Sequence, residues 1–409
     1  MARRTGPEAG PRALALRTLV DYERRNAYLG PLTSAALTSS ALDRRDRALA
    51  TELVQGSVRM KLSLDRCLSP FSRRPLEELE PAVAWALRLA AYQIAYTRVP
   101  DYAAVDATVE AAVEVAGSRV AGYTNAVLRA FLRGRGEVGL PDREGDPEGY
   151  LEARYSHPRW IARMWIEEFG FERAESLCSA DNNTPAVSLR VNLPRCARDE
   201  LAARLDGEGL GCREGSLAPE CLLLEGGGPV SALPGYDEGL FGVQDQGAML
   251  VSHAVSPEKG MEVLDMCAAP GGKANHLAEL MENEGRVLAV DLRPGRLALV
   301  RESAERLGNT AVECLAADAT AIPGVPGESF DRVLVDAPCS GLGTLARKPD
   351  ARWRRGPGEV AELTTLQRRL LAEGAGLVAA GGTLTYSTCT ISRAENQEMA
   401  EWFLEEHSG

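Results

Sequence analysis

The feature that most restricts the fold is an alternation of short apolar segments with amphipathic ones in the C-terminal part of the chain. From Met261 onward, apolar runs of about four to six residues are separated by stretches with helical spacing. In chain order these are MEVLDMC, ANHLAELMEN, RVLAVDL, RPGRLALVRESAERLG, AVECLAAD, FDRVLVDAPC, QRRLLAEGAGLVA and GTLTYSTC. Apolar strands that alternate with helices form a parallel sheet with helices on both faces. We therefore predict an α/β, doubly wound, Rossmann-like fold here.

The rest of the 409 residues is long enough for further domains, each with its own core. Residues 1–136 have helical spacing and no alternating segment, which predicts an all-α domain. Residues 137–150 concentrate Gly, Pro and charge and are typical of a linker. Residues 151–235 mix helical and strand patterns and predict a small α+β module. The α/β domain then occupies residues 236–409.

Charge is distributed unevenly along the chain. Residues 1–135 hold 20 Lys and Arg against 14 Asp and Glu, whereas the remainder holds 26 against 44. A basic front on an acidic body is typical of a module that binds a polyanion such as nucleic acid. Solvated helix faces are the alternative explanation. Both interpretations apply to one basic cluster, Arg44, Arg45 and Arg47.

Nothing in the sequence indicates a membrane segment or a metal site. The most apolar stretch, residues 81–96, is interrupted by Arg88 and Gln93 and is too short to span a bilayer. The nine cysteines form no CxxC pair, there is no HExxH, and the four histidines are scattered. We expect a cytoplasmic protein with reduced thiols and no bound metal, and a monomer by default.

Ligands of doubly wound sheets bind beyond the carboxyl ends of the strands, so the residues that follow each strand are the candidates. After the first strand comes a loop with two glycines, which let the backbone approach a ligand, followed by a helix start with free N–H groups. This candidate cofactor loop consists of Cys267, Ala268, Ala269, Pro270, Gly271, Gly272 and Lys273. It is neither GxGxxG nor GxxxxGK[ST], so hydride transfer and nucleotide hydrolysis are disfavoured.

The later strands also end in polar side chains. Asp291 follows Gly271 by 20 residues, the usual offset for a carboxylate that binds a ribose diol, although such a residue is also often a helix N-cap. Asp318 ends the third strand, where it suits an adenine amino group. Lys273 is one of only four lysines, and we expect it either to place charge near the reacting centre or to close the loop onto Asp265 or a neighbouring carboxylate.

Two cysteines stand at the ends of consecutive strands. Cys339 follows Asp336 in the fourth strand's VDAPCSG, and Cys389 ends the fifth in YSTCT. Because the carboxyl ends of parallel strands meet at one edge of the sheet, we expect both thiols beside the cofactor loop. Their spacing alone does not say which thiol is the nucleophile.

Together these motifs resemble one family. DMCAAPGGKANHLAEL, AVDLRPGRL, AADAT, VDAPCSGLGT with KPDARW, and YSTCTISRAENQ are similar to the ordered motifs of the Sun (Fmu) RNA cytosine-5 methyltransferases. YSHPRWIARMWIEEFG, SLRVN and FGVQDQGAML resemble that family's small RNA-binding module and the start of its catalytic fold. DRRDRALATELVQGSVR, LRLAAYQIAYTRVPDYAAVDATVE and GYTNAVLRAFLR resemble a NusB-type helical RNA-binding domain.

The resemblance implies that the chain transfers a methyl group from S-adenosylmethionine to carbon 5 of one cytosine in 16S ribosomal RNA. It implies Cys389 as the nucleophile and Cys339 as the group that assists release, with Asp336 near the target ring and Lys273 nearby. The loop from Cys267 to Lys273, with Asp291, Asp318 and Asp336, would hold the cofactor. The family continues into a last strand pair that this sequence lacks, so we expect either a truncated sequence or a sheet that ends early.

Three questions stay open at this level. An inactive RNA-binding assembly factor of the same fold is an alternative to the enzyme, although the intact cysteines favour catalysis. An amine methyltransferase is disfavoured, because Asp336-Ala337-Pro338-Cys339 lacks the second Pro and the aromatic residue of that class. A basic run after the active loop either contacts RNA or is a solvated loop: Arg347, Lys348, Arg352, Trp353, Arg354 and Arg355.

Overall fold

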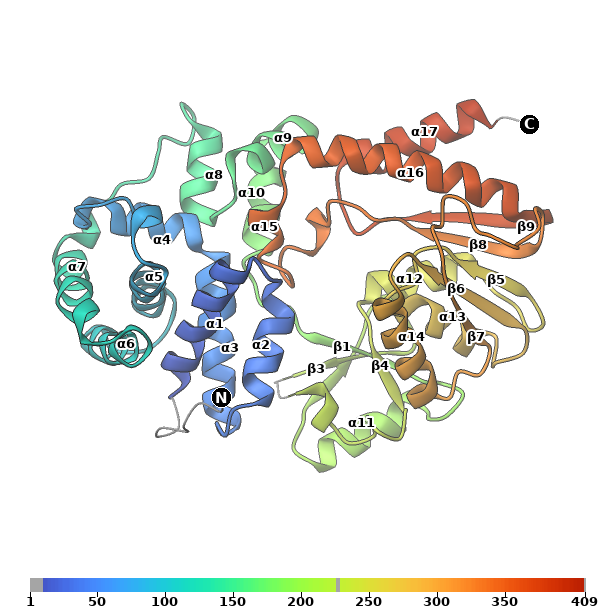
Figure 1. Cartoon of the computed structure of the whole chain (residues 1–409), viewed down its shortest axis with the longest axis horizontal. Helices are drawn as coiled ribbons and strands as arrows, with labels where there is room; N and C mark the ends of the chain where they lie inside the picture. The colour runs from blue at the N-terminus through green and yellow to red at the C-terminus, as the bar shows by residue number, and fades with distance from the viewer. Residues whose placement is uncertain (1–9, 226–228, 408–409) are drawn as a thin grey trace. The chain divides into compact units, whose positions relative to one another are not determined.

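The computed structural model describes residues 10–225 and 229–407, which fold as two compact units (Figure 1). The first unit takes the described residues up to Thr184 together with Thr344–Arg355. The second takes Pro185–Gly343 and the described residues from Gly356 onward. The chain therefore crosses from one unit to the other three times, and each unit is described by itself below.

The first unit is all helical, as the spacing predicted for its front part. Its helices are α1 (Pro11–Arg25), α2 (Leu29–Thr38), α3 (Arg44–Arg59), α4 (Lys61–Leu68), α5 (Pro81–Tyr96), α6 (Asp101–Ala116), α7 (Ala121–Gly134), α8 (Pro147–Tyr155), α9 (Arg159–Phe169), α10 (Phe171–Ala180) and α15 (Ala351–Arg354). α5 is the central one, because every residue from Ala82 to Gln93 is buried. Its Arg88 is neutralised inside the core by Asp65, at 2.6 Å.

The apolar stretch 81–96 is thus a core helix, in keeping with its length. Among the described residues, no helix is both long and apolar enough to cross a membrane.

The compact units divide the chain differently from the expected domains. α8 begins at Pro147, inside the expected linker 137–150, because the Asp146 side chain accepts a hydrogen bond from Gly149 N–H and caps the helix. The expected module 151–235 is split at Thr184: its helices α8 to α10 belong to the helical unit, whereas its strands belong to the second unit.

The second unit contains two sheets. The small one is antiparallel, with strand order β2-β3-β1-β4. It consists of β1 (Val187–Val191), β2 (Cys212–Glu214), β3 (Cys221–Leu224) and β4 (Phe241–Val243), with α11 (Arg198–Gly207) packed on it through Leu201 and Leu205.

The larger sheet is parallel, with strand order β7-β6-β5-β8-β9, as predicted for a doubly wound fold. Its strands are β5 (Glu262–Asp265), β6 (Arg286–Asp291), β7 (Val312–Ala316), β8 (Phe330–Asp336) and β9 (Val378–Ser387). The helices around it are α12 (Gln246–Val255), α13 (Gly272–Leu280), α14 (Pro294–Leu307), α16 (Pro357–Leu377) and α17 (Gln397–Glu406).

Alternate side chains of the central strands point to opposite faces, which explains why the strands are apolar throughout. Val263 packs in a cluster with α12, α13 and α14, whereas the next residue, Leu264, packs with α16 on the other face (Figure 1). The strand order reverses between β5 and β8, so the switch point lies between the ends of these two strands. Among the described residues, β9 is the edge strand beside β8.

Candidate active site

The loop after β5 presents the N-terminus of α13 at the switch point. Gly271 has φ +104°, and a Cβ there would lie 3.0 Å from the Cα of Val300, so only glycine fits. The loop is tied to its surroundings by two backbone bonds: Ala268 N–H donates to Val290 O at 2.9 Å, and Gly271 N–H to Ala268 O at 2.7 Å. The predicted cofactor loop is therefore a rigid turn between a buried strand and a helix.

Three elements converge on Asp336 at the end of β8. Lys273 Nζ, from the first turn of α13, lies 2.6 Å from Asp336 Oδ2. Ser387, the last residue of β9, donates its hydroxyl to Asp336 Oδ1 at 2.7 Å. Lys273 therefore closes the cofactor loop onto a neighbouring carboxylate, which is one of the two roles expected for it. The carboxylate is that of Asp336 rather than that of Asp265.

Asp265 is a further carboxylate at this centre, and the sequence had not singled it out as a site residue. Its side chain is 1% exposed, and neither carboxylate oxygen has a side-chain hydrogen-bond donor. Burial, reinforced by the charge of Asp336, raises the pKa of Asp265 to about 7, although Lys273 partly offsets the shift. The same burial, with Asp265 as neighbour, raises the pKa of Cys267.

Asp291 is the last residue of β6, as predicted, whereas β7 ends at Ala316 and Asp318 lies two residues beyond it. Asp291 is not the N-cap of α14; it accepts a hydrogen bond from Arg293 N–H at 3.0 Å and pairs with Arg296 at 3.3 Å. Arg296 also donates to the cofactor-loop carbonyl of Ala269 at 2.6 Å. Asp318 is exposed, and hydrogen bonds from the Thr320 backbone and hydroxyl lower its pKa.

The two cysteines meet, as the parallel strands predicted. Cys339 Sγ and Cys389 Sγ are 3.2 Å apart, and Cys389 N–H donates to Cys339 Sγ at 3.3 Å. Neither is in a disulfide; Cys389 is exposed and Cys339 is half-buried. The hydrogen bond with Cys389, together with burial, raises the pKa of Cys339. A thiol pair thus lies on the same strand ends as Asp336 and Ser387.

Comparison with known proteins identifies the family. The family model for 16S rRNA methyltransferase RsmB/F matches residues 252–409 of this chain. The model for the NusB family matches residues 9–133, and that for an RsmF/B-like ferredoxin-like domain matches residues 157–231. A probable ribosomal RNA small subunit methyltransferase B from Bacillus subtilis is 39% identical over 400 residues, 97% of this chain and 88% of that protein. The chain belongs to the RsmB/F family of 16S rRNA methyltransferases.

Further relatives agree with the family assignment. A Synechocystis protein with the same description is 38% identical, and the alignment covers 97% of this chain and 89% of that one. The crystal structure of PH0851 superposes with a TM-score of 0.84 at 26% identity over 99% of this chain and 91% of that one. A methyltransferase homolog protein from Pyrococcus horikoshii gives 0.56 at 30% identity, over 62% of this chain and 81% of that one.

The cofactor of RsmB/F methyltransferases is S-adenosylmethionine, as the sequence led us to expect. The chemistry of the loop's surroundings fits this molecule, because three carboxylates, Asp265, Asp291 and Asp336, influence one another there. Lys273 pairs with Asp336 and Arg296 with Asp291, whereas no side-chain donor reaches Asp265. S-adenosylmethionine carries a positively charged sulfonium and an ammonium group. The buried Asp265 oxygens receive no hydrogen bond from a side chain, and a cationic group of the cofactor could serve as their partner. When bound, the cofactor supplies an electrophilic methyl group.

The structure also reveals a buried glutamate in this RsmB/F chain. It holds the loop that follows β8, residues 337–341, which contains Cys339 and is called the cysteine loop below. Glu395 is 0% exposed, and its carboxylate accepts hydrogen bonds from Ser340 N–H at 2.8 Å, Ser340 Oγ at 2.5 Å and Gln367 Nε2 at 3.1 Å. Gln367 also donates to Pro338 O at 2.9 Å. The ENQ of the last motif contains this residue, but nothing in its spacing indicated a partner 55 residues away.

A buried ion pair supports the cofactor loop from the small sheet. Arg190 on β1 donates to both carboxylate oxygens of Glu279 on α13, at 2.8 and 2.6 Å, and to the carbonyl of Gly272 at 2.6 Å. It also donates to Gln244 Oε1. In the sequence, a charged residue within the apolar strand SLRVN could have indicated that Arg190 has a buried partner.

The sequence allowed two interpretations of the basic run after the active loop: contact with RNA or a solvated loop. The structure tests them for two of its members, Arg352 and Trp353. Arg352 is fully buried in the first unit, where its guanidinium donates to the carbonyls of Arg59 at 3.2 Å and Asp181 at 3.0 Å. Trp353 donates its indole N–H to Val58 O at 2.9 Å. Both residues anchor the segment to the helical unit: Arg352 is neither RNA-facing nor solvated, and the half-buried Trp353 is not part of a solvated loop.

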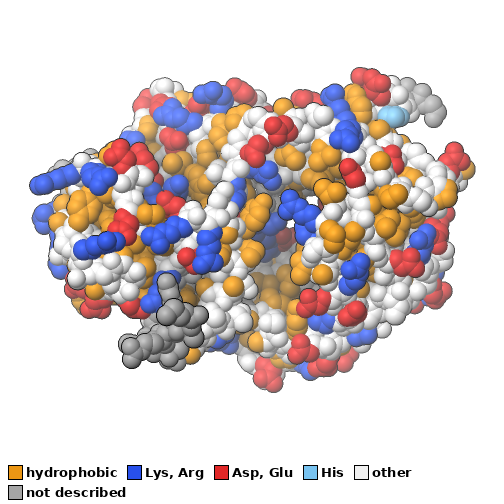
Figure 2. Space-filling view, in the orientation of Figure 1, with side chains coloured by type: hydrophobic (Ala, Val, Ile, Leu, Met, Phe, Trp, Pro, Cys, Tyr) orange, Lys and Arg blue, Asp and Glu red, His pale blue; other side chains and the backbone are white. Residues whose placement is uncertain are grey.

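Other basic residues remain at the surface. Arg347 and Lys348 are exposed, and so are Arg44 and Arg45 in the front helices, whereas Arg47 donates to the carbonyl of Leu42 at 2.8 Å. On the face drawn in Figure 2, Lys and Arg side chains of the helical unit, in the left part of the view, are interspersed with Asp and Glu side chains.

Proposed function

We propose that this RsmB/F methyltransferase methylates carbon 5 of a cytosine in 16S ribosomal RNA through a covalent adduct with Cys389. The observation that carries the proposal is the pair of thiols 3.2 Å apart on the strand ends that also hold the Asp336 to Lys273 ion pair. Carbon 5 of cytosine is a weak nucleophile until a thiolate adds to carbon 6, so two thiols in one site suit this reaction.

Cys389 is the better placed nucleophile. It is exposed, whereas Cys339 is half-buried and its pKa is raised. The Cys389 sulfur forms a bond to carbon 6, and the ring electrons move to carbon 5, which accepts the methyl group. Carbon 5 then gives its proton to water or to a neighbouring base, the double bond re-forms, and the Cys389 sulfur leaves carbon 6 as a thiolate. Because Cys339 Sγ lies 3.2 Å from Cys389 Sγ, we assign assistance with this release to Cys339.

Asp336 and Lys273 support the adduct. Addition of the thiolate makes a ring nitrogen basic, and a carboxylate beside the ring stabilises the protonated nitrogen by a hydrogen bond. Lys273 and Ser387 hold the two oxygens of Asp336 in place, at 2.6 and 2.7 Å. We therefore propose that Asp336 hydrogen-bonds the target cytosine. Lys273 orients the Asp336 side chain and adds positive charge to the site.

The cofactor is assigned to the loop and the flanking carboxylates. Cys267, Ala268, Ala269, Pro270, Gly271 and Gly272 form the turn at the N-terminus of α13, next to which we place the methionine part. Asp291 is assigned to the ribose diol and Asp318 to the adenine, because they lie at or just beyond the ends of the next two strands along the same edge. We infer that the enzyme works in the cytoplasm, as a monomer, with its nine cysteines reduced.

Trapping with a fluorinated base tests the proposal. The full chain is incubated with S-adenosylmethionine and a 16S fragment that contains 5-fluorocytosine, and RNA-linked protein is measured on a denaturing gel. Fluorine blocks the final elimination, so we expect a cofactor-dependent adduct that Cys389→Ser abolishes. Cys314→Ser, a half-buried cysteine on β7, is the control and retains the adduct.

The role of Cys339 has its own readout. With unmodified RNA, Cys339→Ser is expected to accumulate the adduct because release is slowed. An adduct lost in Cys339→Ser and kept in Cys389→Ser would reverse the assignment. RNA binding without any adduct would favour the inactive assembly factor of the same fold.

A further inference from the structure

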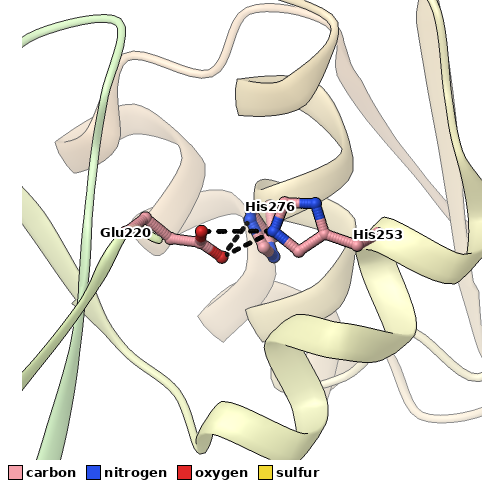
Figure 3. A group of neighbouring side chains, drawn as sticks. All are labelled: Glu220, His253 and His276. Carbon is pink, nitrogen blue, oxygen red and sulfur yellow. Dashed lines mark hydrogen bonds and ion pairs between the residues drawn. The ribbon is translucent and has the colours of Figure 1, made fainter. Parts of the chain in front are cut away.

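A second cluster of polar side chains lies in the second unit, formed by one residue from each of three elements. Glu220 directly precedes β3 of the small sheet, His253 lies on α12, and His276 lies on α13 (Figure 3). The sequence had indicated scattered histidines and no metal site. The fold instead brings two of the four histidines together, with ring centroids 5.3 Å apart and planes perpendicular.

Both imidazoles point at one carboxylate. His253 Nε2 lies 3.0 and 3.1 Å from the two Glu220 oxygens, and His276 Nε2 lies 3.1 Å from Glu220 Oε1. The ligand atoms of the three residues all lie within 4.8 Å of one another. Two imidazole nitrogens and a carboxylate are the donor set of many three-ligand zinc sites.

Glu220 and His276 are buried, with 2% of each side chain exposed, so an ion held between them is shielded from water. His276 Nδ1 has no hydrogen-bond partner, whereas Nε2 faces the Glu220 carboxylate, so an ion bound at Nε2 would move the ring proton to Nδ1.

We propose that Glu220, His253 and His276 bind a divalent transition-metal ion of the Zn²⁺ class, with a water as fourth ligand. Zinc bonds of about 2.0–2.2 Å in a tetrahedron place donor atoms about 3.3–3.5 Å apart. The nitrogen to oxygen distances of 3.0–3.1 Å therefore need to open by only a few tenths of an ångström. The His253 side chain is 34% exposed against 2% for the other two, so the ion and its water enter past His253.

The ion would tie the small sheet to the helix that carries the cofactor loop. His276 is three residues after Lys273, on the first turns of α13, and α12 contacts α13 directly. Binding to the folded state alone raises stability by mass action. Because no acceptor supports His276 Nδ1, we expect affinity about 10–100-fold below that of sites whose ligands have such a partner.

The test titrates the full chain with Co²⁺ and follows its visible spectrum, with Zn²⁺ competition for affinity. We expect one equivalent to give tetrahedral bands without a sulfur-to-cobalt charge-transfer band, since no cysteine is a ligand. Zinc at tenfold excess over Kd is expected to raise Tm of this unit by about 3–6 °C. His253→Gln, at the most exposed ligand, should weaken binding at least about tenfold, whereas His407→Gln, an exposed histidine outside the cluster, should not.

The alternative is a purely hydrogen-bonded triad. Binding that is absent in the wild type, or equally strong in His253→Gln, would overturn the proposal. A charge-transfer band that persists in His253→Gln would place the metal on cysteines and overturn it as well. The His253→Gln protein is expected to keep its fold, because this side chain is the most exposed of the three, and an unchanged circular dichroism spectrum checks this.

Discussion

Removing the Glu395 carboxylate should loosen the cysteine loop, because this side chain is the acceptor that holds it. In Glu395→Ala, Ser340 N–H and one Gln367 N–H lose their partner inside the protein, whereas Ser340 Oγ can turn to Thr390 Oγ1, 2.8 Å away. Each buried donor left without a partner costs about 1–3 kcal/mol. Two such donors predict a loss of about 2–6 kcal/mol in the free energy of unfolding.

Glu395→Gln is the matched conservative change. Its amide oxygen can still accept from Ser340 N–H and Gln367, and only the bond to Ser340 Oγ changes character. We expect a loss of about 1–2 kcal/mol, since one bond to a carboxylate becomes a bond between neutral groups. Glu398→Gln, an exposed position at the start of α17, is the control and should change stability by less than about 0.5 kcal/mol.

The assay combines urea denaturation of the full chain with methylation kinetics. If Glu395 positions the cysteine loop, Glu395→Gln lowers kcat and leaves KM for the cofactor near the wild-type value, because the cofactor loop is built from other elements. A wild-type urea midpoint for Glu395→Ala would refute the hydrogen-bond reasoning. A loss of stability in Glu395→Gln with unchanged kcat would refute the positioning role.

Three further predictions follow from the geometry. Gly271→Ala should cost about 1–2 kcal/mol and weaken cofactor binding measured by calorimetry, because φ is +104° and the new Cβ meets Val300; wild-type affinity would contradict this. Since the pKa of Asp265 is raised to about 7, cofactor affinity should fall about tenfold from pH 8 to pH 6 as the carboxylate protonates, and Asp265→Asn should bind more weakly but without this dependence. Arg352→Met should lower Tm and leave RNA affinity of the folded protein unchanged, whereas Lys348→Ala, at an exposed site, should do the reverse in a filter-binding assay; equal effects would contradict the placement of this segment.

The sequence by itself determined the parts of this protein that depend on local pattern. Apolar strands alternating with amphipathic helices permit little besides a parallel doubly wound sheet, and in such a sheet the strand ends share one edge. That rule is why Cys339 and Cys389, 50 residues apart, could be expected together, and why the loop ending in Lys273 could be placed beside them. Helical spacing alone likewise predicted the helices of the front unit.

Only the tertiary structure decided which distant side chains meet inside the core. Arg190 and Glu279 are 89 residues apart, Glu395 and Ser340 55, and the Glu220 cluster draws on three elements. A buried polar group needs a partner, but the pattern of a sequence does not say which surface will cover it. For the same reason Arg352 read as a surface residue, although backbone carbonyls of the helical unit surround it. Periodicity determines which face of an element is buried, and packing determines what that face touches.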